Sequence, residues 1–228
     1  YDIASCLVGS EMCIRDRFTS GAGNWCTWMF GRDLVNWNNN FTWAKWVTPS
    51  RDLISAFKQE GDEVRFKESI VYYDCNWSNY YPSDNYPFMY KCRSANSSII
   101  KYRYADVLLL KAEALIMQDT PDLEGAADII DEVRDRAKLG ALPTSVRSNK
   151  NAMLNALLKE RRLELAFEGQ RWFDLVRLDK VEEVMNAVYA KDSGRKAQIY
   201  TFDKNSYRLP IPQSVIDAND KIHQNPGY

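Results

Sequence analysis

The chain has 228 residues, of which 45% are hydrophobic and 27% charged, and its formal net charge at pH 7 is −1. A net charge so close to zero offers no electrostatic basis for binding nucleic acid or an anionic membrane surface, and nucleic acid is not expected as a partner. The single histidine, His223, argues against histidine-rich metal sites and Ser-His-Asp catalysis, and we expect no metal and no cofactor. No apolar run approaches the ~20 residues that a membrane-spanning helix needs.

The first residues are expected not to belong to the native protein. Residues 6–17 read CLVGSEMCIRDR and resemble the translation of a sequencing adapter that recurs at the ends of metagenomic reading frames. We therefore interpret residues 1–17 as a non-native leader and leave them out of the fold prediction. On this interpretation the reading frame is truncated at its 5′ end, and any signal peptide lies outside the sequence.

Residues 18–98 are predicted to be a loop-rich region with many aromatic rings. Six of the seven tryptophans lie within the first 77 residues of the chain. Residues 18–47 show neither helical nor strand periodicity, and residues 76–88 mix aromatic rings with Ser, Asn, Asp and Pro. Both stretches are therefore expected to be long irregular loops.

Regular structure is predicted between these two stretches. Thr48 and Pro49 are the residue types that cap and start a helix, and Gly61 is the type that ends one. After this helix we expect short strand character over residues 62–65 and 70–73.

The aromatic loops are the predicted binding surface. A sugar presents apolar C–H faces on which flat rings stack, while neighbouring amide groups bond its hydroxyls. Binding of this kind needs adaptable loops that a rigid scaffold holds in place. The alternative, that each ring only holds the loops together, stays open. The candidate ligand-binding residues are Trp28, Trp37, Trp43, Trp46, Trp77, Tyr80, Tyr81, Asn38 and Asn76.

Residues 99–228 are predicted to be a helical scaffold with an extended tail. Residues 104–118 are apolar on nearly every side and indicate a buried helix. A second helix begins after residues 120–122, ends at Gly140 and carries alanines at points of close approach, which predicts a tetratricopeptide-like hairpin. Further helices are expected over residues 151–168, 170–177 and 181–190, before a tail that Pro210 and Pro212 keep extended. The predicted fold class is therefore mainly α, with a tetratricopeptide-like hairpin and long irregular aromatic-rich loops.

Residues 159–177 combine dense charge of both signs with large apolar side chains. Glu160, Glu164 and Glu168 follow one another at i+4 spacing, and a glycoside hydrolase would need a pair of carboxylates roughly 5–10 Å apart. Like charges at this spacing repel, and each glutamate has an arginine near it, so a structural ion network is favoured and no catalytic residue is assigned. We also expect Trp172 and Phe173 to be buried against the helix of residues 104–118. The predicted network consists of Arg103, Asp106, Glu160, Arg162, Glu164, Arg171 and Asp174.

Four stretches together resemble the C-terminal region of the SusD/RagB family. They read RYADVLLLKAEAL (103–115), IDEVRDRAKL (130–139), ERRLELAFEGQRWFDLVR (160–177) and LPIPQSVIDAND…QNPGY (209–228). Residues 48–65, TPSRDLISAFKQEGDEVR, resemble a further stretch of the same family. Since family members are considerably longer, the resemblance implies a C-terminal fragment, with residues 18–228 as the family's C-terminal domain.

The resemblance also implies a function. It indicates a SusD-like helical fold in a glycan- or nutrient-binding lipoprotein, which is not an enzyme. Such a protein lies on the outward face of a Bacteroidota-type outer membrane and is held there by a lipid anchor in the N-terminal part that is missing here. It captures an oligosaccharide and passes it to a SusC-like TonB-dependent transporter. Two alternatives remain: a tetratricopeptide-type scaffold that binds protein, and a glycoside hydrolase that uses Glu160 or Glu164.

Overall fold

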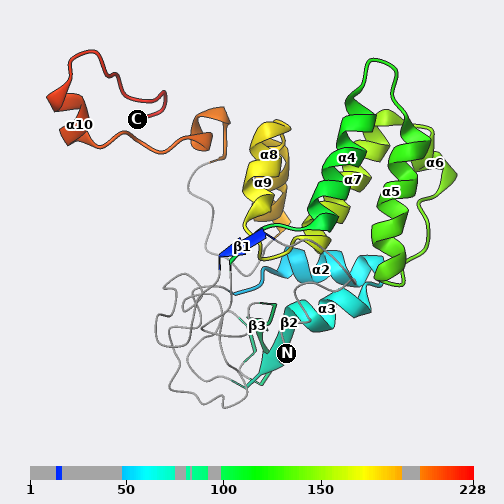
Figure 1. The fold of residues 1–228 in the computed structure, drawn as a ribbon. Helices are drawn as coiled ribbons and strands as arrows, with labels where there is room; N and C mark the ends of the chain where they lie inside the picture. Colours follow the sequence, from blue (N-terminus) through cyan, green and yellow to red (C-terminus); the bar gives the residue numbers. More distant parts are fainter. Residues whose placement is uncertain (1–13, 17–47, 75–80, 83, 92–98, 192–200) are drawn as a thin grey trace. The chain divides into compact units, whose positions relative to one another are not determined.

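The computed structural model describes residues 14–16, 48–74, 81–82, 84–91, 99–191 and 201–228 (Figure 1). The chain divides into two compact units, residues 1–171 and 172–228. Helices dominate the described residues, which confirms the predicted mainly α class. In this part of the chain no helix is both long and apolar enough to cross a membrane.

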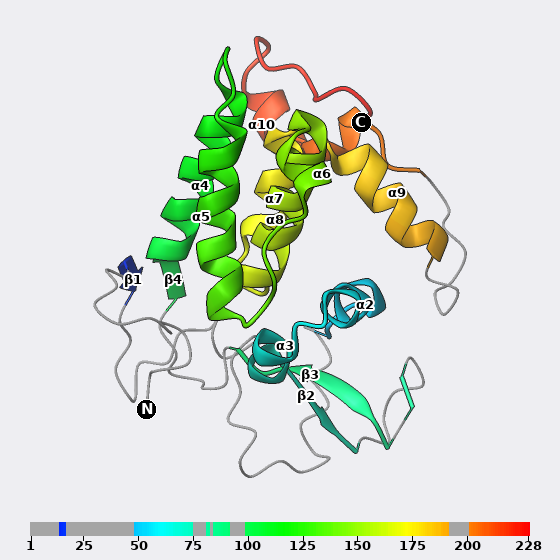
Figure 2. The same ribbon diagram turned by 90° about the vertical axis from the view of Figure 1, so that its right-hand side faces the viewer.

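The first unit is built on a helical hairpin. Helices α4 (Tyr104–Met117) and α5 (Leu123–Arg136) lie side by side and are joined by a short connection, and α7 (Lys150–Glu164) packs against both (Figures 1 and 2). The short helix α6 (Thr144–Arg147) leads into α7. The core between these helices contains Leu109, Ala112, Ile116, Ala126, Ala127, Ile130, Val133, Leu142, Met153 and Leu157. Fully buried alanines let the helices approach closely, which confirms the predicted hairpin.

The prediction that the first helix of the hairpin is buried on every side is wrong for one face. Val107 and Met117 are each 52% exposed, and Leu110 is 39% exposed. Helices α5 and α7 cover only part of the circumference of α4, so its apolar residues divide between a buried and an exposed face.

Two shorter helices, α2 (Arg51–Glu60) and α3 (Glu63–Ser69), precede the hairpin in sequence. Ser50 caps α2 by accepting the N–H of Leu53, so the helix begins two residues later than predicted. Gly61 ends α2 as expected, with a left-handed φ of 68°. The strand expected over residues 62–65 is wrong, because Asp62 accepts the N–H of Arg65 and starts a helix there.

A β-hairpin follows α3. Strand β2 (Ile70–Tyr73) confirms the predicted strand and pairs antiparallel with β3 (Tyr86–Met89). The irregular segment predicted over residues 76–88 is therefore wrong from Tyr86 onward. Tyr86 and Phe88 are buried and their ring centroids lie 5.0 Å apart, so these rings pack within the hairpin.

A second strand pair is formed by β1 (Ile14–Asp16) and β4 (Ile99–Tyr102), which run antiparallel. Strand β1 lies within the segment that the sequence predicts to be a non-native leader. That interpretation stays a prediction.

The second unit contains most of α8 (Gln170–Arg177), then α9 (Val181–Lys191), the 3₁₀ helix η2 (Lys204–Tyr207) and α10 (Gln213–Ala218). Asn186 on α9 bonds both the N–H and the carbonyl of Phe202, each at 2.9 Å. Gln224 bonds the N–H and carbonyl of Ile211 in the same way, which ties the two ends of the tail together.

The predicted burial of the aromatic pair on α8 is wrong for Phe173 and is only partly met by Trp172. Phe173 is 66% exposed, whereas Trp172 is half-buried. The buried face of α8 carries Asp174 and Leu175, and Phe173 lies away from it.

Candidate functional site

The charged stretch at the end of α7 forms a buried ion-pair cluster. The side chains of Glu160, Glu164 and Glu168 are only 1%, 4% and 4% exposed. Their spacing places Glu160 and Glu164 on one face of α7. Glu168 follows the helix instead of continuing it, because α7 ends at Glu164 and not at residue 168 as predicted.

A tight turn after α7 brings Glu168 into the cluster. Phe167 and Gly169 both have left-handed backbone angles, with φ values of 66° and 81°. Such angles cannot continue a right-handed helix. The turn folds the chain back, and the carboxylate of Glu168 reaches Lys91 and Arg103, two of the cations that also contact Glu164.

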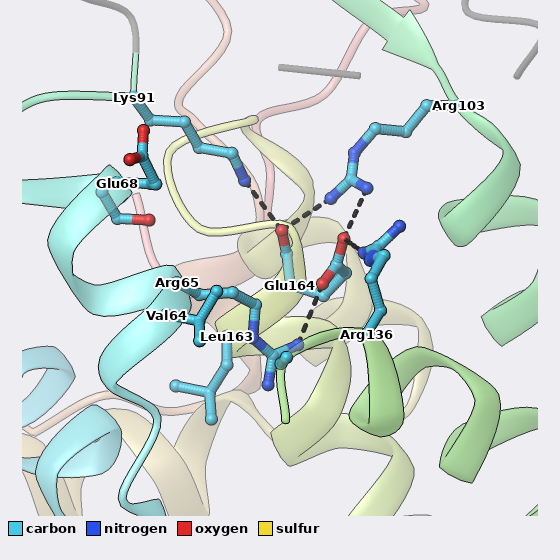
Figure 3. A pocket seen from close by; sticks show the side chains of 10 residues that line it. Val64, Arg65, Glu68, Lys91, Arg103, Arg136, Leu163 and Glu164 are labelled. Atoms are coloured by element: carbon cyan, nitrogen blue, oxygen red, sulfur yellow. Dashed lines mark hydrogen bonds and ion pairs between the residues drawn. The ribbon is translucent and has the colours of Figure 1, made fainter. Parts of the chain in front are cut away.

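Glu164 is the centre of the cluster. Four cations from different parts of the first unit converge on it, as Figure 3 shows: Arg65 of α3, Lys91 after β3, Arg103 before α4 and Arg136 at the end of α5. These four segments are distant in sequence, so the cluster joins α3, β3, α4 and α5 to α7.

Each carboxylate oxygen of Glu164 accepts a hydrogen bond from at least one guanidinium group. Nη1 of Arg103 lies 2.5 Å from Oε1, and Arg136 contacts the same oxygen. Nη1 of Arg65 lies 2.9 Å from Oε2. The backbone carbonyl of Glu164 accepts from Nη2 of Arg103 at 2.6 Å and from Nζ of Lys91 at 2.7 Å.

This environment keeps Glu164 ionised. Burial alone would raise its pKa, but the charges of Arg103, Arg136, Lys91 and Arg65 lower the pKa of Glu164 well below its usual range. A carboxylate with so low a pKa holds no proton near neutral pH and cannot act there as a general acid.

The flanking glutamates differ from each other in charge environment. Burial acts to raise the pKa of Glu168, but Lys91 at 2.5 Å and Arg103 at 2.9 Å lower it overall. Burial raises the pKa of Glu160, although Arg65 lies 2.6 Å away and Arg134 lies 3.3 Å away. Glu160 meets fewer cations than Glu164 does, so the cost of burial is offset less.

This geometry counts against the glycoside hydrolase alternative. A hydrolase needs one protonated and one ionised carboxyl group beside an open cleft. Both oxygens of Glu164 are occupied by guanidinium groups, and Glu160 is 1% exposed. Among the described residues no group of three or more His, Cys, Asp or Glu side chains could hold a metal ion.

The structure brings only three of the seven predicted network residues into the central cluster: Arg103, Glu160 and Glu164. The others have partners elsewhere. Asp106 pairs with Arg161 at 2.8 Å, and both are buried. The remaining contacts are Arg162 with Asp52 at 2.5 Å, Arg171 with the carbonyl of Leu158 at 3.1 Å, and Asp174 with Arg177 at 2.8 Å.

Sequence reasoning missed several members of the cluster. One local signal was available: Asp62 and Arg65 stand three residues apart, and Nε of Arg65 lies 2.5 Å from Oδ2 of Asp62. Nothing local marks Lys91 as a partner, since it follows a short strand at some distance from the glutamates in sequence. The missed residues are Asp62, Arg65, Lys91, Arg134 and Arg136.

A cavity of about 130 Å³ opens beside Glu164. Its wall comes from α3, from Lys91 two residues after β3, from Arg103 just before α4, from the end of α5 and from α7. The charged residues in this wall are Arg65, Glu68, Lys91, Arg103, Arg136 and Glu164.

The predicted sugar-binding residues are mostly outside the described part of the chain. Tyr81 is described and is half-buried. Its hydroxyl donates to the carbonyl of Pro49 at 2.8 Å, its ring meets Tyr86 edge-on at 5.6 Å, and the guanidinium of Arg51 lies 4.8 Å from its centroid. Its role in binding stays a prediction. The candidates outside the described residues are Trp28, Trp37, Trp43, Trp46, Trp77, Tyr80, Asn38 and Asn76.

Three sequence comparisons relate this chain to the same protein family. A sequence model of the SusD family matches residues 84–228. SusD-like protein P38 of Formosa agariphila is 42% identical over 99 residues, which cover 41% of this chain and 19% of that protein. SusD-like protein P2 of the same organism is 35% identical over 143 residues, covering 60% of this chain and 27% of that protein. The matched region thus amounts to about a fifth to a quarter of the length of these curated relatives.

A solved structure shares the fold. Surface glycan-binding protein A from Bacteroides uniformis superposes with a TM-score of 0.52 at 25% identity, covering 71% of this chain and 37% of that protein. The similarity extends beyond the helical hairpin alone, since the match covers most of the chain.

Proposed function

The chain belongs to the SusD family, and on that premise we propose that it is part of an outer-membrane protein that captures oligosaccharides. The observation that carries the proposal is the family match over residues 84–228, which includes the ion cluster's Lys91, Arg103 and Glu164. A protein with the same fold at 25% identity is named a surface glycan-binding protein, which supports glycan as the ligand class.

The described residues support a model in which the helical part of the first unit is the scaffold and the aromatic region is the binding surface. The ion cluster joins five segments of the first unit, and its buried ion pairs form one connected network that favours a single arrangement of these segments. Trp77 and Tyr80 lie in the connection between β2 and β3, whose strands are paired from Ile70 with Met89 to Tyr73 with Tyr86. Residues that bind ligands are often found on segments that connect the elements of a rigid scaffold.

The mechanism that we propose is non-covalent. Rings of the aromatic region stack on the C–H faces of the sugar, and amide groups bond its hydroxyls. The bound oligosaccharide then passes to a SusC-like TonB-dependent transporter on the outward face of the outer membrane. No bond is made or broken, in keeping with an ion cluster whose glutamate Glu164 is held ionised by arginine.

One observation favours the protein-binding alternative. The exposed face of α4 carries Tyr104, Val107, Leu110 and Met117, which are 39–52% exposed. A stripe of apolar residues on a tetratricopeptide-like helix is typical of a surface that packs against another helix. Further helices of the same protein would cover an apolar stripe equally well, so the protein-binding alternative ranks second.

Affinity electrophoresis of the full-length natural protein on a panel of polysaccharides tests the proposal. We expect retardation on at least one polysaccharide, and we expect it to be lost in the combined variant Trp37→Ala, Trp43→Ala and Trp77→Ala. Tyr104→Ala is the matched control, because it removes an exposed ring from α4, outside the aromatic region. Retardation that survives the triple substitution would refute binding by the aromatic region.

A further inference from the structure

The two aromatic segments of the sequence, residues 18–47 and 75–80, both end at one junction of the first unit. The first segment is followed by Thr48, at the entry to α2, and the second is followed by Tyr81, in the connection between β2 and β3. Pro49 and Tyr81 stand 32 residues apart in sequence, yet they are joined by a hydrogen bond. The structure therefore brings together the two points from which the aromatic segments depart.

Two tyrosine hydroxyls join these points. The hydroxyl of Tyr86 lies 2.9 Å from Oγ1 of Thr48, and the hydroxyl of Tyr81 donates to the carbonyl of Pro49 at 2.8 Å. Tyr86 is only 2% exposed, and Pro49 is fully buried. A buried polar group that loses its partner costs free energy, so each bond favours this one arrangement of the chain.

Ring contacts and a helix cap reinforce the junction. The rings of Tyr81 and Tyr86 meet edge-on at 5.6 Å, and the guanidinium of Arg51 lies 4.8 Å from the centroid of Tyr81, within the range of a cation–π contact. Ser50 caps α2. Residues 48–51 are thus held by the hairpin on one side and by the helix on the other.

Packing alone does not call for a hydroxyl at this place. Phe88 follows Tyr86 by two residues on β3, so both side chains lie on one face of the strand. Phe88 is 3% exposed, and its ring centroid lies 5.0 Å from that of Tyr86. A phenylalanine therefore fills this core without a polar atom. The hydroxyl of Tyr86 adds a directional bond, which fixes where Thr48 lies on the hairpin.

We propose that Tyr81 and Tyr86 are positioning residues for oligosaccharide binding. Their hydroxyls hold the start of α2 against the end of the β2–β3 hairpin, so that the two aromatic segments serve one oligosaccharide together. Tyr81 acts through Pro49 and not by stacking on the sugar itself. This inference rests on the proposed capture of oligosaccharides by the aromatic region.

Hydrogen–deuterium exchange tests the junction without any ligand. In Tyr86→Phe we expect faster exchange both in peptides that cover residues 48–57 and in peptides that cover residues 81–89, because one bond ties the two. Tyr72→Phe is the matched control: Tyr72 lies on β2 of the same hairpin and packs on Phe66 at 6.4 Å, and within the described part of the chain its hydroxyl has no hydrogen-bond partner. It should change neither peptide. Faster exchange confined to the hairpin in Tyr86→Phe would refute the coupling.

Affinity electrophoresis of the full-length natural protein on laminarin, xylan, pullulan and alginate tests the role in binding. We expect Tyr86→Phe to bind about threefold to tenfold more weakly, in line with the loss of one hydrogen bond. If Tyr86 acts through the first segment, Trp46→Ala should also cost less in Tyr86→Phe than in the unmodified protein. A merely structural role would lower Tm and leave the effect of Trp46→Ala unchanged, which would contradict the proposal.

The outcome for Tyr81→Phe separates positioning from direct contact. This variant keeps the ring and loses the bond to Pro49, so binding should weaken as it does in Tyr86→Phe. Full binding by Tyr81→Phe would contradict the positioning role of Tyr81. If the unmodified protein is retarded on none of the four polysaccharides, oligosaccharide capture itself is refuted and the positioning role falls with it.

A substitution on the other side of the bond covers the case in which Tyr86→Phe fails to fold. Thr48→Val removes the hydroxyl that faces Tyr86 and keeps the shape of the side chain. It should weaken binding as Tyr86→Phe does. The combination of both substitutions should bind no more weakly than either alone, because both remove the same bond. Unchanged binding in Thr48→Val would overturn the proposal.

Discussion

Replacing Glu164 by glutamine is the sharpest test of the ion cluster. The substitution preserves size and removes the charge that Arg65, Arg103 and Arg136 share. A glutamine oxygen still accepts one or two of these bonds, but its amide group turns a donor toward a guanidinium. Three buried or partly buried cations then lack their common anion. Breaking a buried pair in this way costs about 3–5 kcal/mol, against a total stability of about 5–15 kcal/mol.

Urea unfolding followed by far-UV circular dichroism measures this loss. Glu63→Gln is the matched control, because Glu63 forms an exposed i,i+4 pair with Lys67 in which both side chains are 72% exposed. Surface pairs of this kind contribute little, so the control should change the free energy of unfolding by less than about 0.5–1 kcal/mol. If Glu164→Gln costs no more than its control, the cluster does not stabilise the fold as argued.

Two further predictions concern pH and backbone conformation. The pKa values of Glu164, Glu168 and Glu60 are lowered in the folded chain, so the unfolded chain binds more protons on acidification. The stability that these carboxylates contribute should be fully present above about pH 5 and should fall as the pH drops below about 4. Urea unfolding midpoints at pH 6, 5, 4 and 3 measure this fall. The midpoint should decline less steeply with falling pH in Glu164→Gln than in the unmodified chain. Gly61 has φ 68° and nothing within 4 Å of an added Cβ, so Gly61→Ala should cost about 1–2 kcal/mol through backbone strain alone. Gly140→Ala has the same free space without the left-handed φ and should be nearly neutral; an equal drop in Tm for both variants would contradict this reasoning.

Local sequence patterns correctly predicted the elements that depend on residues close to one another in sequence. The long apolar run of residues 104–118 and the alanines of the two helices predicted the hairpin, since both can be recognised from neighbours along the chain. Gly61 predicted the end of α2, because a left-handed residue after a helix favours glycine whatever surrounds it. The resemblance to the SusD/RagB family rested on the same stretches, and the family match over residues 84–228 agrees with it.

The sequence predictions failed at one element for a local reason and at another for a tertiary one. Residues 62–65 lack a strong period, and the prediction missed a local signal: the carboxylate of Asp62 both caps α3 and pairs with Arg65 three residues later, which favours helix. Phe173 was expected to be buried because it is large and apolar, yet the buried face of α8 carries Asp174 and Leu175.

The sequence by itself determined that Glu160 and Glu164 lie on one helical face and that arginines stand near them. Only the tertiary structure decided which cations they meet: Arg65 lies 99 residues from Glu164 in sequence, and Arg103 lies 61. Helical periodicity defines which side chains share a face, because it follows from the geometry of one element. What covers that face depends on how distant segments pack, and no pattern within a single segment records it.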